Sequence, residues 1–105
     1  MKAIVVLSTA DNMETASTIA RALTAEGEAA CVNIVPGIRS VYRWQGKLCE
    51  DEELLMVIKT TEARFEAVRS RVRALHSYEL PEVIALPVVA GDEEYLRWLS
   101  DNVAT

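Results

Sequence analysis

The side chain best suited to metal or proton chemistry is His76, the single histidine of the chain. A neutral imidazole is a common metal ligand and general base. Tyr78 and Glu82 follow closely, so we consider a ligand site formed by these three side chains. The alternative is structural, because an imidazolium just after a helix interacts favourably with the dipole at the helix C-terminus. A site with several imidazoles would need more than one copy of the chain.

Cys31 and Cys49 are the two thiols of the chain. A thiol becomes a nucleophile when a neighbouring base or helix N-terminus lowers its pKa, and the sequence offers no convincing pairing with His76. Cys31 falls in an expected core strand, where a free cysteine behaves as a small buried apolar side chain. Cys49 lies near an expected hairpin and should be more exposed. Two cysteines are too few for a secreted disulfide scaffold, so we expect two free thiols.

Two runs of charge are interpreted as solvated surface. The acids of residues 50–53 lack the spaced oxygen donors and glycine of a calcium loop, so they read as the solvated end of a strand. An expected helix carries Arg64, Arg69, Arg71 and Arg73, and Glu62 and Glu66 precede Arg69 and Arg73 on one face. This order of acids and bases suits the helix dipole and short-range ion pairs. Neither run predicts a binding site.

The aromatic side chains Tyr42, Trp44 and Tyr78 are candidates for an interface. Aromatic rings with polar tips suit either a contact between subunits or a ligand cleft, here with Arg39 and Lys59 nearby, and we favour the contact. The sequence contains no glycine-rich phosphate loop, metalloprotease helix or Ser-His-Asp constellation. We therefore expect a protein that is not an enzyme.

The first half of the chain predicts a strand, a helix and a hairpin. The β-branched run 3–9 is typical of a strand buried on both faces. Asp11 and Glu14 resemble a capping box at the start of a helix over 12–26, with Gly27 as its left-handed stop. The chain is extended again from residue 29, bends at Pro36-Gly37, and turns back at Gln45-Gly46 in a long β-hairpin.

The second half predicts a return strand, a helix, a further strand and a short terminal helix. The hairpin returns through residues 50–58 into the core. Thr61 can cap a second helix, in which Phe65, Val68, Val72 and Leu75 form a stripe that packs on a sheet. A connection over 76–82 leads to a strand over 83–89, which Pro87 pushes toward an edge. Gly91-Asp92 starts a short C-terminal helix.

The order β-α-β-β-α-β predicts an α+β fold, a ferredoxin-like sandwich with an extended hairpin, as one domain over residues 1–105. Both helices must lie on one face of a single antiparallel sheet. The other face would be left uncovered by helices, and exposure of its Val, Leu and Ile side chains to water is unfavourable. Oligomerisation is the simplest remedy.

Composition excludes two classes of partner. The formal net charge of −5 repels phosphates, so we expect no nucleic acid partner. The longest apolar runs, 3–7 and 54–58, are too short to cross a bilayer, and the N-terminus lacks the pattern of a signal peptide. We therefore expect a cytoplasmic protein with no membrane partner.

Four segments are specific in combination: Ala30-Cys31-Val32-Asn33 followed by Pro36-Gly37, the hairpin Tyr42-Arg43-Trp44-Gln45-Gly46-Lys47, Lys59-Thr60-Thr61, and the string from Leu75 to Glu82. Together they resemble the CutA divalent-cation tolerance family over almost the whole chain. The resemblance implies a ferredoxin-like subunit in a homotrimer similar to the PII signal-transduction proteins, with strand edges extended across subunits. It also implies a link to tolerance of copper and other divalent cations, with no required cofactor.

The chain departs from some copper-binding relatives at two positions. They carry a cysteine where this chain has Ser8 and a second histidine where it has Leu75. Copper prefers thiolate and imidazole donors. We therefore expect copper or another divalent ion to bind only weakly, through His76 with help from Glu82 or a neighbouring subunit.

Two functions are thus carried forward. The first is a non-enzymatic trimeric binding or signalling protein associated with divalent-cation tolerance. The second is a small-molecule sensor or an undiscovered enzyme that uses a cleft between subunits. That cleft would be lined by Arg39, Lys59, Tyr78 and Glu82.

Overall fold

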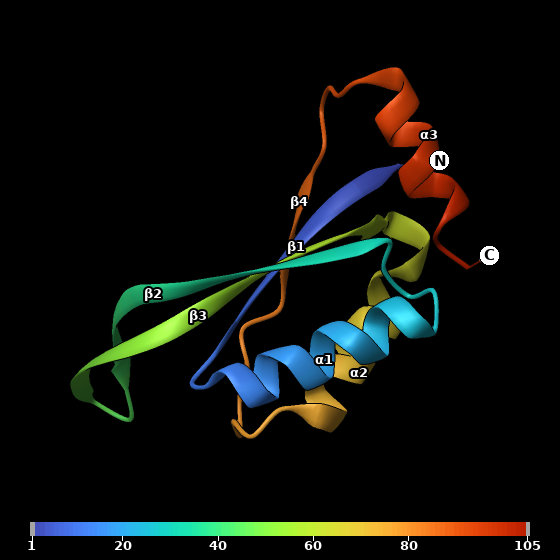
Figure 1. Ribbon diagram of the computed structural model, residues 1–105. Coiled ribbons are helices and arrows are strands. Elements are labelled where there is room, and N and C mark those ends of the chain that lie inside the picture. The colour runs from blue at the N-terminus through green and yellow to red at the C-terminus, as the bar shows by residue number, and fades with distance from the viewer. Residues whose placement is uncertain (1, 105) are drawn as a thin grey trace.

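The computed structural model describes residues 2–104 and contains four strands and three α-helices over this range (Figure 1). In chain order the elements are β1 (Ala3–Ala10), α1 (Met13–Ala25), β2 (Cys31–Trp44), β3 (Lys47–Thr61), a 3₁₀ turn (Glu62–Arg64), α2 (Phe65–Leu75), β4 (Ile84–Pro87) and α3 (Glu93–Asp101). No helix among the described residues is long and apolar enough to cross a membrane.

The strands form one antiparallel sheet in the order β2-β3-β1-β4. Strand β3 lies between β1 and β2, which are joined by α1, so the unit is a split βαβ motif. Helices α1 and α2 lie on the same side of the strands (Figure 1). The predicted ferredoxin-like arrangement is therefore confirmed, and β4 is an edge strand, as Pro87 indicated.

The core lies between this sheet and the two helices. Strand β1 alternates along its length, with the side chains of Ile4, Val6, Ser8 and Ala10 buried and the intervening ones only half-buried. The expectation of a strand buried on both faces is thus wrong for the single chain, because helices cover only one face. From the other elements the core receives Ala16, Ile19, Leu23, Ala29, Met56, Ile58, Val68 and Val72.

The second face of the sheet is apolar and largely open. Helix α3 covers it at one end only, where Leu99 and Val103 pack against Ala3. The cross-strand pairs Leu7 with Val57 and Val5 with Leu86 place the remaining apolar side chains on this face. We call it the open face; it carries Val5, Leu7, Val35, Leu55, Val57, Ile84 and Leu86. Val35, Ile84 and Leu86 are 43%, 51% and 49% exposed. The predicted uncovered face therefore exists.

Helix α1 has well-defined ends. Its N-cap is Asn12 and not Asp11, because the Asn12 side chain accepts a hydrogen bond of 2.8 Å from the Thr15 amide. At the C-terminus Gly27 has φ of +70°, and the Glu28 amide donates to the Leu23 carbonyl at 2.9 Å. This is the Schellman closure expected of Gly27.

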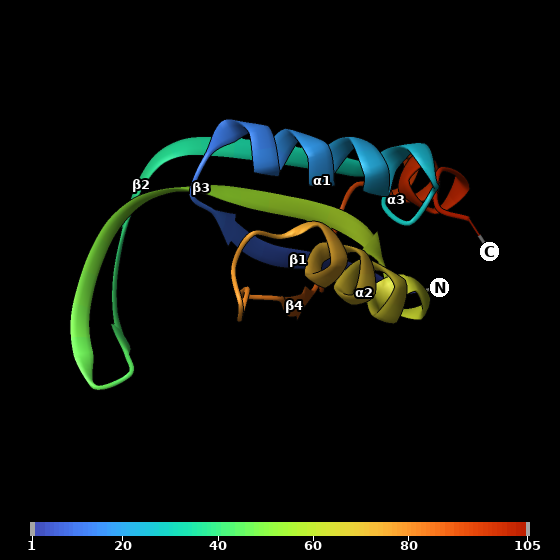
Figure 2. The same cartoon turned by 90° about the horizontal axis from the view of Figure 1, so that it is seen from below.

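Strands β2 and β3 continue beyond the helices as a two-stranded arm. At Pro36-Gly37 the register with β3 shifts between Val35 and Ile38, so the predicted bend is a β-bulge inside one continuous strand. The turn at Gln45-Gly46 has positive φ at both residues, +50° and +78°, which suits a two-residue hairpin. Figure 2 shows the arm curving away from the helices. With the arm included, the chain measures 44 × 25 × 22 Å.

Three local expectations are corrected around α2. Thr61 makes no side-chain capping bond, because the 3₁₀ turn separates it from the helix. Leu75 ends the helix 38% exposed and lies outside the buried stripe of Val68 and Val72. Arg71 is not simply solvated, since its guanidinium forms two hydrogen bonds, of 2.9 and 3.2 Å, with the Glu28 carboxylate. This pair holds α2 to the connection between α1 and β2, and it raises the pKa of Arg71.

Candidate functional site

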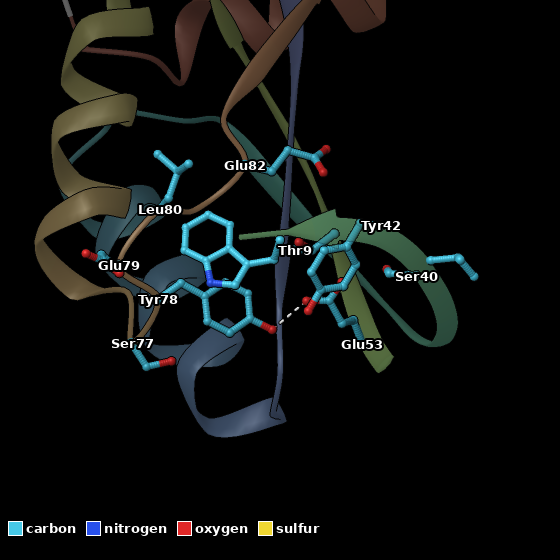
Figure 3. A pocket seen from close by; sticks show the side chains of 11 residues that line it. Thr9, Ser40, Tyr42, Glu53, Ser77, Tyr78, Glu79, Leu80 and Glu82 are labelled. Atoms are coloured by element: carbon cyan, nitrogen blue, oxygen red, sulfur yellow. Dashed lines mark hydrogen bonds between the residues drawn. The ribbon is translucent and has the colours of Figure 1, made fainter. Parts of the chain in front are cut away.

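A cleft of about 690 Å³ lies at the base of the arm (Figure 3). Its walls come from three places: the arm, the end of β1, and the connection between α2 and β4. The lining residues are Thr9, Ser40, Val41, Tyr42, Trp44, Glu53, Ser77, Tyr78, Glu79, Leu80 and Glu82.

Alternation along the arm places its polar and aromatic side chains on this cleft. Ser40, Tyr42 and Trp44 are two residues apart in β2, so they share one face of the strand. Their register partners Asp51, Cys49 and Lys47 lie on the same face of β3, two residues apart and in line with Glu53. The β-bulge and the curvature of the arm turn this face toward the connection over residues 76–82 (Figure 2).

His76 fixes that connection to the sheet. Its Nε2 lies 2.6 Å from the Thr9 carbonyl oxygen, which only accepts, so Nε2 carries the proton and donates. Its Nδ1 accepts a hydrogen bond of 3.0 Å from the Tyr78 amide. The ring is therefore a neutral imidazole with both nitrogens engaged. In this arrangement the side chain ties the connection to β1.

Glu53 is the most buried ionisable group of the cleft. Its side chain is only 7% exposed, and its Oε2 accepts a hydrogen bond of 2.5 Å from the Tyr78 hydroxyl. Burial, followed by this bond to Glu53, raises the pKa of Tyr78. The interpretation of residues 50–53 as wholly solvated is thus wrong at Glu53, because strand alternation turns it to the same face as Leu55 and Val57.

Two further groups carry shifted pKa values. The Tyr42 hydroxyl donates to the Asp51 carboxylate, and this hydrogen bond is the main cause that raises the pKa of Tyr42 to about 12. Burial raises the pKa of the Glu82 carboxyl, and the nearby charge of Glu53 raises it further. A cation bound between Glu53 and Glu82 would favour the ionised form of both carboxyl groups.

The sequence-predicted cleft residues divide into two groups. Tyr42, Trp44, Tyr78 and Glu82 line the cleft together. Arg39 does not, because it lies in register with Glu52 on the other face of the arm and pairs with Glu50 at 3.0 Å.

Lys59 is also absent from the lining and lies on the open face, where its Nζ donates to Asn33 Oδ1 at 2.7 Å. The cleft is therefore acidic and aromatic instead of basic. Seven lining residues were missed, namely Thr9, Ser40, Val41, Glu53, Ser77, Glu79 and Leu80. Of these, Glu53 was detectable from its spacing to Leu55 and Val57.

Metal donors are few within the single chain. Among residues 2–104 no group of three His, Cys, Asp or Glu side chains is placed to hold a metal ion. His76 would have to release its bond with the Tyr78 amide before Nδ1 could coordinate. Both cysteines are free and half-buried, so the ranking of Cys31 as the buried thiol is wrong. Cys31 occupies the open face opposite Lys59 and not the helix-covered core. This donor set does not fit a copper centre inside one subunit.

Comparison with known proteins identifies the family. The family model described as CutA1 divalent ion tolerance protein matches residues 4–102. The chain belongs to this family. A curated relative, the divalent-cation tolerance protein CutA of Thermus thermophilus, is 55% identical over 98 residues, which cover 93% of this chain and 95% of the relative.

Other CutA proteins agree in sequence and structure. The solved structure of the Thermus thermophilus Cut A1 protein superposes with a TM-score of 0.94 at 53% identity, covering 97% of this chain and 99% of that one. CutA from Xylella fastidiosa gives a TM-score of 0.95 at 39% identity, covering 99% and 100%. The chloroplastic CutA of Arabidopsis thaliana is 48% identical over 94% of this chain, which spans 54% of that longer relative.

Proposed function

We propose that this CutA family member is a homotrimeric binding or signalling protein of the cytoplasm, which acts in divalent-cation tolerance without covalent catalysis. The observation that carries the proposal is the open face, an apolar sheet surface beside a projecting arm. Membership of a family named for divalent-ion tolerance supports the role in tolerance.

The open face supports assembly on energetic grounds. Its apolar side chains include Ile84 and Leu86 on one edge strand and Val35 on the other. Burying apolar surface stabilises an assembly by about 25 cal/mol per Å² before the entropy of association is subtracted. A contiguous apolar patch of this kind marks an interaction surface.

The two edges of the sheet support a closed ring. Strands β2 and β4 are the edge strands, and β2 also extends into the arm. Pairing the arm of one copy with the sheet edge of the next is a head-to-tail contact, and such contacts make rings when the rotation closes. Three copies would close the ring, in line with the expected similarity to PII proteins.

The oligomeric state tests this part of the proposal. Light scattering during gel filtration should give a mass near three times the chain mass of 11.6 kDa. A stable monomer at micromolar concentration would contradict it.

Metal binding by this trimer should be weak. His76 offers a single imidazole whose Nδ1 is already occupied by the Tyr78 amide, and Glu82 is a hard oxygen donor that copper does not prefer. Titration calorimetry with copper should therefore give a low affinity, reduced further in His76→Ala. Equal affinities of wild type and variant would exclude His76 as a principal ligand, and tight binding retained by the variant would point to Cys31 and Cys49.

A second candidate function is supported by the cleft. Its volume of about 690 Å³ and its convergent polar groups are those of a small-molecule site. A sensor would bind its ligand unchanged, whereas an undiscovered enzyme would turn it over. Chromatographic analysis of a bound metabolite after prolonged incubation separates the two.

A further inference from the structure

The charge of the cleft has one sign. Its described lining includes Glu53, Glu79 and Glu82 but no Lys or Arg. The whole chain also carries a formal charge of −5, so the surrounding field adds to this local potential. A cleft of this kind repels phosphates and carboxylates and concentrates cations.

The rest of the lining consists of aromatic and aliphatic side chains together with the hydroxyl groups of Thr9, Ser40 and Ser77. Trp44, Tyr42 and Tyr78 contribute three aromatic rings, and Val41 and Leu80 contribute aliphatic surface. Both phenol hydroxyls already donate to carboxylates, Tyr42 to Asp51 and Tyr78 to Glu53. These bonds fix the orientation of the rings. Figure 3 shows Tyr78 and Tyr42 converging from the two sides of the cleft, with Glu53 between them.

Aromatic faces combined with carboxylates match one class of ligand. The face of an aromatic ring attracts a cation, and rings that surround an ammonium group recognise it even when it has no hydrogen-bond donor. We propose that the cleft binds a small organic cation, an ammonium group carried on an apolar body, between the aromatic rings and the carboxylates of Glu53 and Glu82.

A bare divalent ion fits this cleft less well. Hard cations need six or more oxygen ligands or retain several waters, whereas Glu53 Oε2 is committed to Tyr78, and Val41, Trp44 and Leu80 offer no oxygen ligand. An organic cation uses both features of the lining, since its body covers the apolar walls while its charge faces the carboxylates. The volume of about 690 Å³ also suits a molecule better than an ion.

The protonation of Glu82 predicts a pH dependence of ligand affinity. Burial and the charge of Glu53 raise the pKa of Glu82, so its proton competes with a bound cation. Affinity for an ammonium ligand should therefore fall as the pH decreases through the titration of Glu82. This dependence should be weaker in Glu82→Gln, which cannot ionise.

The proposal concerns a ligand and not the assembly, so it goes beyond the proposed trimer, and its test uses a readout other than mass. Choline is a suitable probe because 3,3-dimethylbutan-1-ol has the same shape without the charge. The chain has two tryptophans. Trp98 lies on α3 and does not line the cleft, so Trp98→Phe leaves Trp44 as the fluorescent reporter.

In this background choline should change the Trp44 fluorescence with saturation, and the neutral alcohol should bind about fivefold or more weakly, since a cation–π contact contributes about 1 kcal/mol. Glu82→Gln should weaken choline binding by a similar factor. Glu93→Gln, the same change on α3 away from the cleft, should leave it unchanged.

Three results would overturn the proposal: equal affinity for choline and the alcohol, a choline response unaffected by Glu82→Gln, or a response that calcium chloride at equal ionic strength reproduces. Light scattering on the same samples reports the oligomeric state separately. Failure of the trimer and failure of the ligand site are therefore distinguishable.

Discussion

At the scale of single residues, the two fully buried hydroxyl side chains, Ser8 and Thr60, differ in one respect. Thr60 Oγ1 donates to the Glu28 carbonyl at 2.7 Å, whereas Ser8 Oγ has no hydrogen-bond partner among the described residues. Both side chains are fully buried. A buried polar group without a partner costs free energy, and a satisfied one does not.

This difference predicts opposite effects on stability. Ser8→Ala should raise the free energy of unfolding by about 1 kcal/mol, because it removes an unsatisfied hydroxyl. Thr60→Val should lower it by about 1 kcal/mol, because the Glu28 carbonyl then loses its donor. Urea denaturation at neutral pH measures both. A loss of stability in Ser8→Ala would show that its hydroxyl has a partner, such as a buried water.

The cleft tyrosines predict a loss of stability in alkali. The pKa of Tyr42 is raised from 10.0 to about 12, and that of Tyr78 is raised as well. Because each folded-state pKa lies above the unfolded value, the stabilisation is fully present below about pH 10 and is lost as the pH rises through the folded-state values.

Urea denaturation at pH 9 and pH 11 measures this loss. The advantage of the wild type over a Tyr42→Phe, Tyr78→Phe double variant should shrink between these two values. Tyr95→Phe is the control, since the Tyr95 hydroxyl has no carboxylate partner among the described residues. An advantage that stays constant with pH would argue against both hydrogen bonds.

Residue types alone indicated part of the site. The sequence suggested Tyr42, Trp44, Tyr78 and Glu82 as a group, and these residues do line one cleft. Arg39 was misplaced because the bulge at Pro36-Gly37 sets which face of the arm each side chain occupies. The role of His76 was hidden, since its partner, the Thr9 carbonyl, is a backbone atom that every residue type presents.

At the scale of elements, two glycines hold positive φ in different surroundings. Gly27 ends α1 with φ of +70°, and a Cβ built there would lie 3.0 Å from the Cβ of Ala104. Gly37 forms the bulge of β2 with φ of +76°, and a Cβ there would meet nothing within 4 Å. Both positions strain an L side chain, but only Gly27 adds a steric contact.

Substituting alanine for each glycine separates the effect of backbone strain from that of the steric contact with Ala104. Gly37→Ala should lower the free energy of unfolding by about 1 kcal/mol, the cost of a left-handed non-glycine residue. Gly27→Ala should lower it by about 2 kcal/mol or more, because the segment at Ala104 must also move. Thermal and urea unfolding of both variants measure the difference. Equal decreases in the free energy of unfolding would show that the segment at Ala104 moves without destabilising the protein.

Elements were predictable wherever a local signal sets them. The left-handed glycine after α1, the Gln45-Gly46 turn and the edge position implied by Pro87 all lie where the sequence placed them. The 3₁₀ turn over Glu62–Arg64 was missed. Its backbone is set by packing between the end of β3 and α2, including the bond from the Glu62 amide to the Lys2 carbonyl, and such contacts have no pattern in the local sequence.

At the scale of the whole molecule, β3 carries apolar side chains on both faces, and we expect assembly to bury those on one face only. Val57 lies in the middle of the open face, opposite Leu7 and Asn33. Leu48 is paired with Arg43 near the tip of the arm, on the other face of the strand, and is 76% exposed. If the open face is buried between subunits, a charge at Val57 should disrupt assembly, whereas one at Leu48 need not.

Val57→Asp should therefore convert the trimer to a monomer, because three buried carboxylates without partners would each cost several kcal/mol. Leu48→Asp should retain the mass of the trimer. Light scattering measures the masses, and circular dichroism of the Val57→Asp monomer should keep the helix and strand signals, since this face is already open in the single chain. A folded Val57→Asp trimer would show that assembly uses another surface. Dissociation of Leu48→Asp alone would place the contact at the outer face of the arm.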